Sequence, residues 1–262
     1  MKRRDFIHST GVLGLTLPFA ALGNNQGETV EQEIKRKLFI FGGNRDKAFM
    51  RYIVALTGKE NPKICFVPTA MGDSPNAIIA WYASVETLPL RPFVLKTFIS
   101  SYNTKSSFED TIMGMDAIVV GGGNTLNMLA IWKYQGIDLI LRKAYDAGVV
   151  MSGGSAGSLC WFQNGTTDSR PINVSKIDCL GWIKGSHCPH YDSEVSRKPL
   201  YHDLIKRGEL PPGYACDDSA GLYFENENMK GAFSVKESSK SYFVDYVNGK
   251  IVENELPGIM LN

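Results

Sequence analysis

The sequence predicts an α/β fold, a three-layer α/β/α sandwich with a mainly parallel sheet and antiparallel strands near the C-terminus. Three observations lead to this prediction. Short apolar runs recur without polar alternation, as in strands that are buried on both faces of a sheet. Stretches of helical periodicity separate them, and parallel strands need such crossovers. In the last third of the chain the apolar runs become closely spaced and are punctuated by turns.

The first two thirds supply the expected sandwich. Buried strands are predicted at residues 37–41, 64–67, 93–95, 117–120 and 149–151. Helices are predicted at residues 44–56, 74–88 and 125–147, the last with a break at Gly136.

The last third begins with a helix at residues 198–207 and continues with four short strands. We expect these strands, at residues 220–224, 231–235, 242–246 and 250–252, to lie antiparallel at the edge of the same sheet. No internal repeat or linker interrupts the chain, so residues 27–262 are predicted to form a single domain.

Composition restricts the partners. The chain has 262 residues, is 44% hydrophobic and carries a formal net charge of +1, with no long block of like charge. Nucleic-acid binders concentrate positive charge in a patch or stripe, so a small peptide substrate fits better than a polyanion. The oligomeric state stays open.

The N-terminus has the layout of an export signal. Arg3 and Arg4 precede a short apolar stretch that ends near residue 23 and is followed by polar residues. The paired arginines resemble a twin-arginine signal, so residues 1–26 are predicted to direct the protein to the periplasm or outside the cell, with no membrane attachment after their removal. One alternative is a cytoplasmic protein with an apolar N-terminus, and another is a membrane anchor that is retained.

The five cysteines form no CxxC pair, and a chain of this length has core enough without disulfides. A zinc site built from Cys188 with His187 or His190 is a minor alternative. We expect neither a metal nor an organic cofactor.

The motif with the clearest chemistry is Gly153-Gly154-Ser155-Ala156-Gly157, a G-x-S-x-G pattern between a predicted strand and a predicted helix. Such a turn exposes the serine hydroxyl at the carboxyl end of the strand, and the helix that follows directs N–H groups toward a developing oxyanion. The alternative is a glycine-rich turn that only packs closely or holds a phosphate. A dinucleotide-binding pattern is not present, since Gly121-Gly122-Gly123-Asn124 is not G-x-G-x-x-G.

A nucleophilic serine needs a base, and three histidines lie beyond the signal. His187 and His190 belong to a predicted strand and its end, where their spacing directs them to opposite faces. His190, after a proline at the strand end, is favoured as the base, while His187 is expected to pack or support. His202 falls within a helix and is expected to be exposed.

A carboxylate should orient the histidine. The candidates are Asp168, Asp192, Glu194, Asp217 and Asp218, and the residues alone do not decide among them.

Three segments together resemble the peptidase E family of serine peptidases, which also includes the cyanophycinases. They are Gly121-Gly122-Gly123-Asn124-Thr125, Ser152-Gly153-Gly154-Ser155-Ala156-Gly157 and Cys188-Pro189-His190-Tyr191. The resemblance covers residues 37–225 and implies a fold akin to class I glutamine amidotransferases.

By position, the resemblance implies Ser155 as nucleophile, His190 as base and Asp168 as acid. It also implies an oxyanion hole and substrate contacts at Gly122, Gly123, Asn124 and Ala156. The implied activity is hydrolysis of small peptides, Asp-containing ones among them, through an acyl-enzyme. The alternatives are a cyanophycinase-like depolymerase, an esterase and a non-catalytic binding protein of the same fold.

Overall fold

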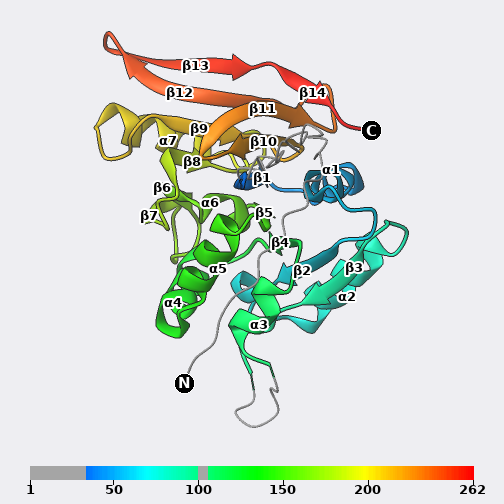
Figure 1. Ribbon diagram of the computed structural model, residues 1–262. Helices are drawn as coiled ribbons and strands as arrows, with labels where there is room; N and C mark the ends of the chain where they lie inside the picture. Colours follow the sequence, from blue (N-terminus) through cyan, green and yellow to red (C-terminus); the bar gives the residue numbers. More distant parts are fainter. Residues whose placement is uncertain (1–33, 100–105) are drawn as a thin grey trace, which may run out of the picture. The chain divides into compact units, whose positions relative to one another are not determined.

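The computed structural model describes residues 34–99 and 106–262, which belong to one compact unit that begins at Ile34 (Figure 1). The predicted signal at residues 1–26, and the domain boundary at residue 27, lie outside the described residues.

The larger of two sheets carries the predicted parallel strands. Its order is β14-β11-β10-β1-β5-β4-β2-β3. The parallel part consists of β1 (Lys37–Phe41), β5 (Val150–Gly154), β4 (Ala117–Val120), β2 (Lys63–Val67) and β3 (Arg91–Val94). On the other side of β1, the sheet continues through antiparallel β10 (Ala220–Glu225) and β11 (Asn228–Ser234) to the short β14 (Gly258–Met260).

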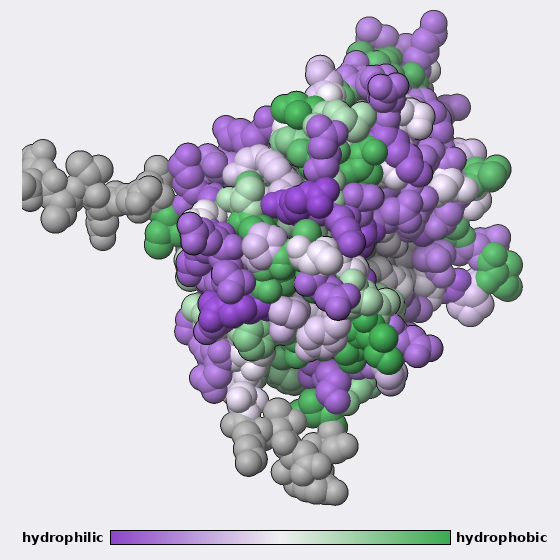
Figure 2. Space-filling model, turned by 90° about the vertical axis from the view of Figure 1, so that its right-hand side faces the viewer, coloured by the Kyte–Doolittle hydropathy of each residue, from purple (hydrophilic) through white to green (hydrophobic). Residues whose placement is uncertain are grey.

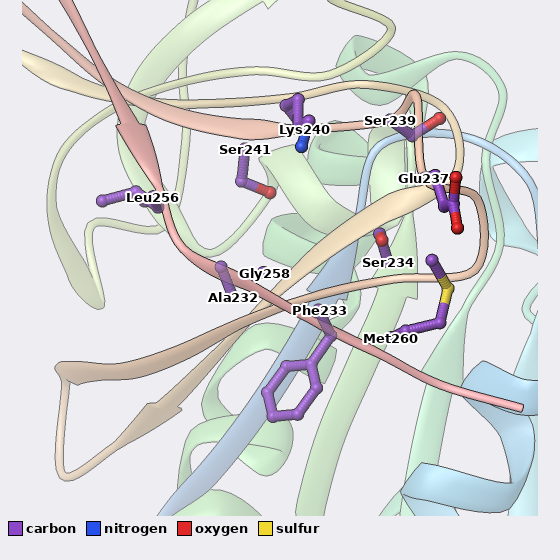
Figure 3. Close-up of a pocket in the computed structure, with 10 residues that line it drawn as sticks. All are labelled: Ala232, Phe233, Ser234, Glu237, Ser239, Lys240, Ser241, Leu256, Gly258 and Met260. Carbon is purple, nitrogen blue, oxygen red and sulfur yellow. The ribbon is translucent and has the colours of Figure 1, made fainter.

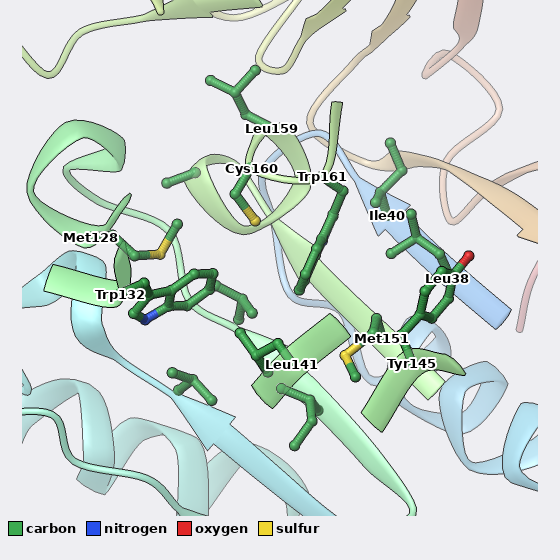
Figure 4. Close-up of a cluster of buried hydrophobic side chains, with 14 of the residues drawn as sticks. Leu38, Ile40, Met128, Trp132, Leu141, Tyr145, Met151, Leu159, Cys160 and Trp161 are labelled. Carbon is green, nitrogen blue, oxygen red and sulfur yellow. The ribbon is translucent and has the colours of Figure 1, made fainter. Parts of the chain in front are cut away.

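Helices cover both faces of this sheet. Alternate residues of β1 enter different cores, Phe39 packing with α1 (Lys47–Thr57) and α2 (Pro75–Val85), and Leu38 with the helices opposite. Those are α3 (Phe108–Met113), α4 (Thr125–Gln135) and α5 (Ile137–Asp146), whose core includes Trp132, Tyr145 and Trp161 (Figure 4). The three-layer α/β/α arrangement is therefore confirmed.

The predicted break at Gly136 is also confirmed. Gly136 has φ 71°, a left-handed conformation that ends α4 and begins α5. This conformation is costly for residues with a Cβ, so a glycine separates two helices where periodicity alone would predict one.

The second sheet was not predicted. Its order is β13-β12-β9-β8-β6-β7, formed by β6 (Phe162–Thr167), β7 (Ser175–Asp178), β8 (Ile183–Cys188), β9 (Gly213–Cys216), β12 (Ser241–Val247) and β13 (Lys250–Leu256). Helix α7 (Arg197–Lys206) packs against it through Tyr201, Leu204 and Ile205, which join Cys188 and Val244 in a separate core. In Figure 1, β12 and β13 lie at the top of the view.

This sheet corrects part of the C-terminal prediction. The strands expected at residues 220–224 and 231–235 do lie antiparallel at one end of the large sheet, as β10 and β11. Those expected at 242–246 and 250–252 instead pair with β9 and with each other. Strand patterns reveal which residues are extended, but not which neighbour they pair with, because pairing partners are chosen by tertiary packing.

The surface shows no dominant apolar patch on the face seen in Figure 2, where hydrophobic side chains are scattered among hydrophilic ones. Among the helices of the described residues, none combines the length and the apolar character needed to cross a bilayer.

Candidate active site

Ser155 lies on a strained turn at the carboxyl end of β5. Its backbone has φ 55° and ψ −119°, and α6 (Ala156–Leu159) begins with the next residue. Few non-glycine residues adopt positive φ, and such strain persists only where the surrounding structure enforces it. The small neighbours are required here, since a Cβ on Gly154 would lie 2.2 Å from the Phe41 ring. The turn therefore has the geometry of a nucleophile elbow.

The Ser155 hydroxyl lies in a hydrogen-bonded chain of three side chains. Its Oγ is 2.8 Å from Nε2 of His190, and Nδ1 of His190 is 2.6 Å from Oδ1 of Asp218. With the imidazole neutral and its proton on Nδ1, the ring donates to Asp218 and its Nε2 accepts from the serine. The expected meeting of Ser155 and His190 is thus observed in the structure.

Asp218 is held by its own backbone contacts. It follows β9, and its N–H donates to Oδ1 of Asp192 at 2.9 Å. Its carbonyl accepts from the N–H groups of Gly43 and Asn44, at 3.1 and 3.0 Å. The carboxylate therefore lies at the junction of the two sheets, where the loop after β1 meets the connection from β9 to β10.

Gly43 is a site residue that the sequence analysis did not single out. A Cβ at this position would lie 2.4 Å from Oδ1 of Asp218 and 2.8 Å from the His190 ring. Contacts this short do not occur, so only glycine leaves room for the imidazole and its carboxylate. The signal in the sequence is the Gly42-Gly43 pair at the carboxyl end of a buried strand.

The assignment of Asp168 as the acid is corrected by this geometry. Both ring nitrogens of His190 have other partners, Ser155 and Asp218. Asp168 lies just after β6 with its side chain 63% exposed, and its Oδ1 is 3.4 Å from Nη2 of Arg197. Closeness to the serine along the chain was misleading because β6 carries Asp168 into the second sheet, where Arg197 is its partner.

The predicted oxyanion loop approaches the serine. A Cβ on Gly122 would lie 3.1 Å from Cβ of Ser155, so this backbone packs directly on the turn. Gly123 has φ 118°, and a Cβ there would lie 2.4 Å from the Ala70 carbonyl oxygen. The N–H groups of Gly123 and Ala156 have no acceptor among the residues that the structure describes.

Asn124 has a different role from the one expected. Its N–H donates to the Ala70 carbonyl at 2.8 Å, its Oδ1 caps α4 by accepting from the N–H of Asn127, and its Nδ2 donates to the carbonyl of Ser169. All three groups are used within the protein, so Asn124 shapes the loop that carries Gly122 and Gly123.

His187 packs, as expected. It is fully buried and stacks on Phe162 with ring centroids 4.7 Å apart. Nδ1 donates to the Tyr214 carbonyl at 3.1 Å, and Nε2 lies 3.0 Å from Oγ of Ser158. Burial lowers the pKa of His187 to about 3, so the ring is neutral at physiological pH.

The prediction that His202 is exposed is wrong. It lies on α7 with its Nε2 2.6 Å from the hydroxyl of Tyr191, and its side chain is 23% exposed. Burial lowers its pKa as well.

Two other carboxylates considered from the sequence lie next to the hydrogen-bonded set Ser155–His190–Asp218. Asp217 is buried and accepts from the N–H of Lys240 at 2.7 Å, and burial raises its pKa to about 6. Glu194 lies on the Ser155 side of His190, with Oε1 3.9 Å from Nε2.

Metal-binding geometry is not found in the described part of the chain, where no three His, Cys, Asp or Glu side chains are grouped to hold an ion. The cysteines form no disulfide, and burial raises the pKa of the Cys188 thiol to about 12. A cavity of about 220 Å³ lies between β11, β14 and the start of β12 (Figure 3), and neither Ser155, His190 nor Asp218 lines it.

Comparison with known proteins identifies the family. Residues 38–231 match the model of peptidase family S51. The chain belongs to peptidase family S51. The uncharacterized peptidase YgaJ of Bacillus subtilis is 44% identical over 207 residues, covering 79% of this chain and 88% of that protein. The expected membership of the peptidase E family is thereby confirmed, and the chain is a serine-type peptidase.

Two solved structures show the same fold. A peptidase from an acI-B1 Actinobacterium aligns with a TM-score of 0.64 at 15% identity, covering 85% of this chain and 96% of that one. A putative peptidase E protein from Listeria monocytogenes aligns with a TM-score of 0.59 at 19% identity, covering 77% of this chain and 100% of that one.

Proposed function

We propose that this S51 peptidase hydrolyses small peptides through an acyl-enzyme on Ser155, with His190 as general base and Asp218 as the carboxylate that orients it. The hydrogen-bonded chain Ser155–His190–Asp218 carries the proposal. Nothing else in the described residues brings a hydroxyl, an imidazole and a carboxylate into line at a strained turn.

In the first step Nε2 of His190 takes the proton of Ser155 as Oγ attacks the peptide carbonyl. The N–H groups of Gly123 and Ala156 are the donors proposed for the oxyanion. Asp218 stabilises the imidazolium without itself becoming protonated. His190 then gives its proton to the leaving amine, and water, activated by the same ring, hydrolyses the ester on Ser155.

The decisive test is Ser155→Ala. Removing the nucleophile of such a triad costs about 10⁶-fold in kcat. The far-UV circular dichroism and the midpoint of urea unfolding should stay close to those of the wild type. A fluorophosphonate probe should label the wild-type protein at Ser155 and leave the variant unlabelled, since labelling needs an activated hydroxyl. Peptide turnover that survives in Ser155→Ala would contradict the mechanism.

The substrate class is addressed by a panel of Asp-X dipeptides, other small peptides, ester substrates and cyanophycin. Preferential cleavage of the peptides would support the proposal. Esterase or depolymerase activity in their place would support the alternative hydrolases, and absence of both labelling and turnover would favour a binding protein.

Export is a separate proposal that rests on residues 1–26 alone. Replacing Arg3 and Arg4 with lysine should retain the protein in the cytoplasm, which cell fractionation and immunoblotting measure. Unchanged export of this variant would contradict a twin-arginine route.

A further inference from the structure

A carboxylate that the proposed triad does not need lies at its reacting end. Oε1 of Glu194 is 3.9 Å from Nε2 of His190, the same nitrogen that lies 2.8 Å from Oγ of Ser155. Asp218 occupies the opposite nitrogen of the ring. Glu194 therefore lies beside the place where the scissile bond must sit.

Glu194 is held in this position by a buried arginine. Nε of Arg197 donates to Oε2 at 2.6 Å and Nη2 to Oε1 at 3.3 Å, while Nη1 donates to the carbonyl of Thr166 at 2.8 Å. The side chain of Arg197 is 3% exposed and that of Glu194 is 35% exposed. A planar guanidinium that anchors both carboxylate oxygens fixes the orientation of Glu194, yet one side of the carboxylate still faces solvent.

Open space adjoins this carboxylate. A hollow of about 400 Å³ lies beside it, lined by Tyr191, Asp192, Glu194, Val195, Lys198, Pro199 and His202. The cation in its lining is already paired, since Nζ of Lys198 lies 2.7 Å from Oε2 of Glu253. Two carboxylates, Asp192 and Glu194, line the same hollow, so a positive group is favoured beside them.

We propose that Glu194 binds a cationic nitrogen of the peptide substrate, either its free N-terminal ammonium or a basic side chain. This inference rests on the proposed function. In a peptide cleaved after its first residue, the ammonium and the scissile carbonyl are bonded to the same Cα. A fixed carboxylate within a few ångströms of Nε2 lies where that ammonium would be. Charge-assisted hydrogen bonding there would align the carbonyl with Ser155.

The test compares kcat/KM for matched peptides that differ only in the substrate cation. One pair is an aminoacyl p-nitroanilide with a free or an acetylated N-terminus, and a second pair is an acetylated aminoacyl p-nitroanilide with Lys or its uncharged isostere norleucine as the amino acid. The variant is Glu194→Gln, which removes the charge and keeps the shape. Asp168→Asn is the matched control, because Asp168 also contacts Arg197 but is 63% exposed and makes no contact with His190.

Glu194→Gln should lower the preference for the cationic member of one pair by roughly ten- to hundredfold, the value of a hydrogen bond to a charged group. Asp168→Asn should leave the preference unchanged. Loss confined to the first pair identifies the N-terminal ammonium, and loss confined to the second identifies a basic side chain.

Fluorophosphonate labelling separates the two proposals. If Glu194→Gln is labelled at the wild-type rate while both preferences stay unchanged, the role of Glu194 is overturned and the triad stands. If the wild-type protein is neither labelled nor active on any peptide, both proposals fall. An equal loss on both members of each pair, with slower labelling, would also overturn the inference, because Glu194 would then act on His190 and not on the substrate.

Discussion

The two sheets contribute differently to the site. The large sheet supplies Ser155 at the end of β5, a strand buried between two layers of helices. The second sheet supplies His190 just after β8, and Asp218 comes from the connection that leads from β9 back to β10. The proposed nucleophile is thus a local feature of one strand–turn–helix unit, whereas the positions of the proposed base and acid depend on how the second sheet packs on the first.

Two histidines, one on β8 and one just after it, have very different surroundings. His187 and His190 are three positions apart, yet His187 is fully buried on Phe162 while His190 lies beyond the end of β8 and reaches Ser155. His190 also has φ 54°, so the chain turns sharply at this residue. The first ring stabilises the sheet, and the second is available for proton transfer.

Of the effects that concern the contact between the two sheets, the largest tests which carboxylate is the functional partner of His190. Asp218→Asn should lower kcat/KM by about 10⁴-fold, because an amide at this position favours the wrong tautomer of the histidine. Asp168→Asn should have little effect, since its partner is Arg197. Peptidase assays on both purified variants measure the contrast. A loss in Asp168→Asn with retention in Asp218→Asn would restore the assignment by sequence position.

The next effect tests the junction between the loop after β1 and the second sheet. Gly43→Ala places a methyl group against the His190 ring and Asp218, so one of them must shift by about 1 Å. Displacement of this size costs about 10²-fold in turnover. Gly258→Ala is the control, because a Cβ there has no atom within 4 Å among the described residues. Wild-type kcat in Gly43→Ala would mean that the junction is loosely packed.

The smallest effect concerns the stability of the second sheet. Burial lowers the pKa of His187 to about 3, from the ordinary histidine value of 6.5. A group with a depressed folded-state pKa contributes stability that is present above the unfolded-state pKa and is lost as pH falls toward the folded-state pKa. Its contribution should therefore fall by about 2 kcal/mol between pH 7 and pH 5.

Urea unfolding at both pH values, in the wild type and in His187→Gln, measures the contribution of His187 to the free energy of unfolding. The wild type should lose about 2 kcal/mol more than the variant on acidification. The glutamine amide can still donate to the carbonyl of Tyr214, which keeps that hydrogen bond in the comparison. An identical pH dependence in both proteins would show that His187 can be protonated without unfolding.

The sequence alone determined the layered α/β architecture and singled out Ser155, the proposed nucleophile. Short apolar runs, helical crossovers and the Gly136 break are local signals, and they depend on backbone conformations that neighbouring residues dictate. Ser155 was identifiable for the same reason, since its strained turn requires small residues on both sides within a few positions. His190 could be favoured because only three histidines follow the signal.

Only the tertiary structure decided the second sheet, the carboxylate that contacts His190 and the position of Gly43. Strands β12 and β13 have the same pattern as β10 and β11, and only packing distinguishes their sheets. Asp218 lies next to a second carboxylate, Asp217, and nothing local shows that one faces His190 while the other is buried against Lys240. Gly43 lies against both His190 and Asp218, which are far from it in the chain. Such close approaches arise only when the two sheets pack together.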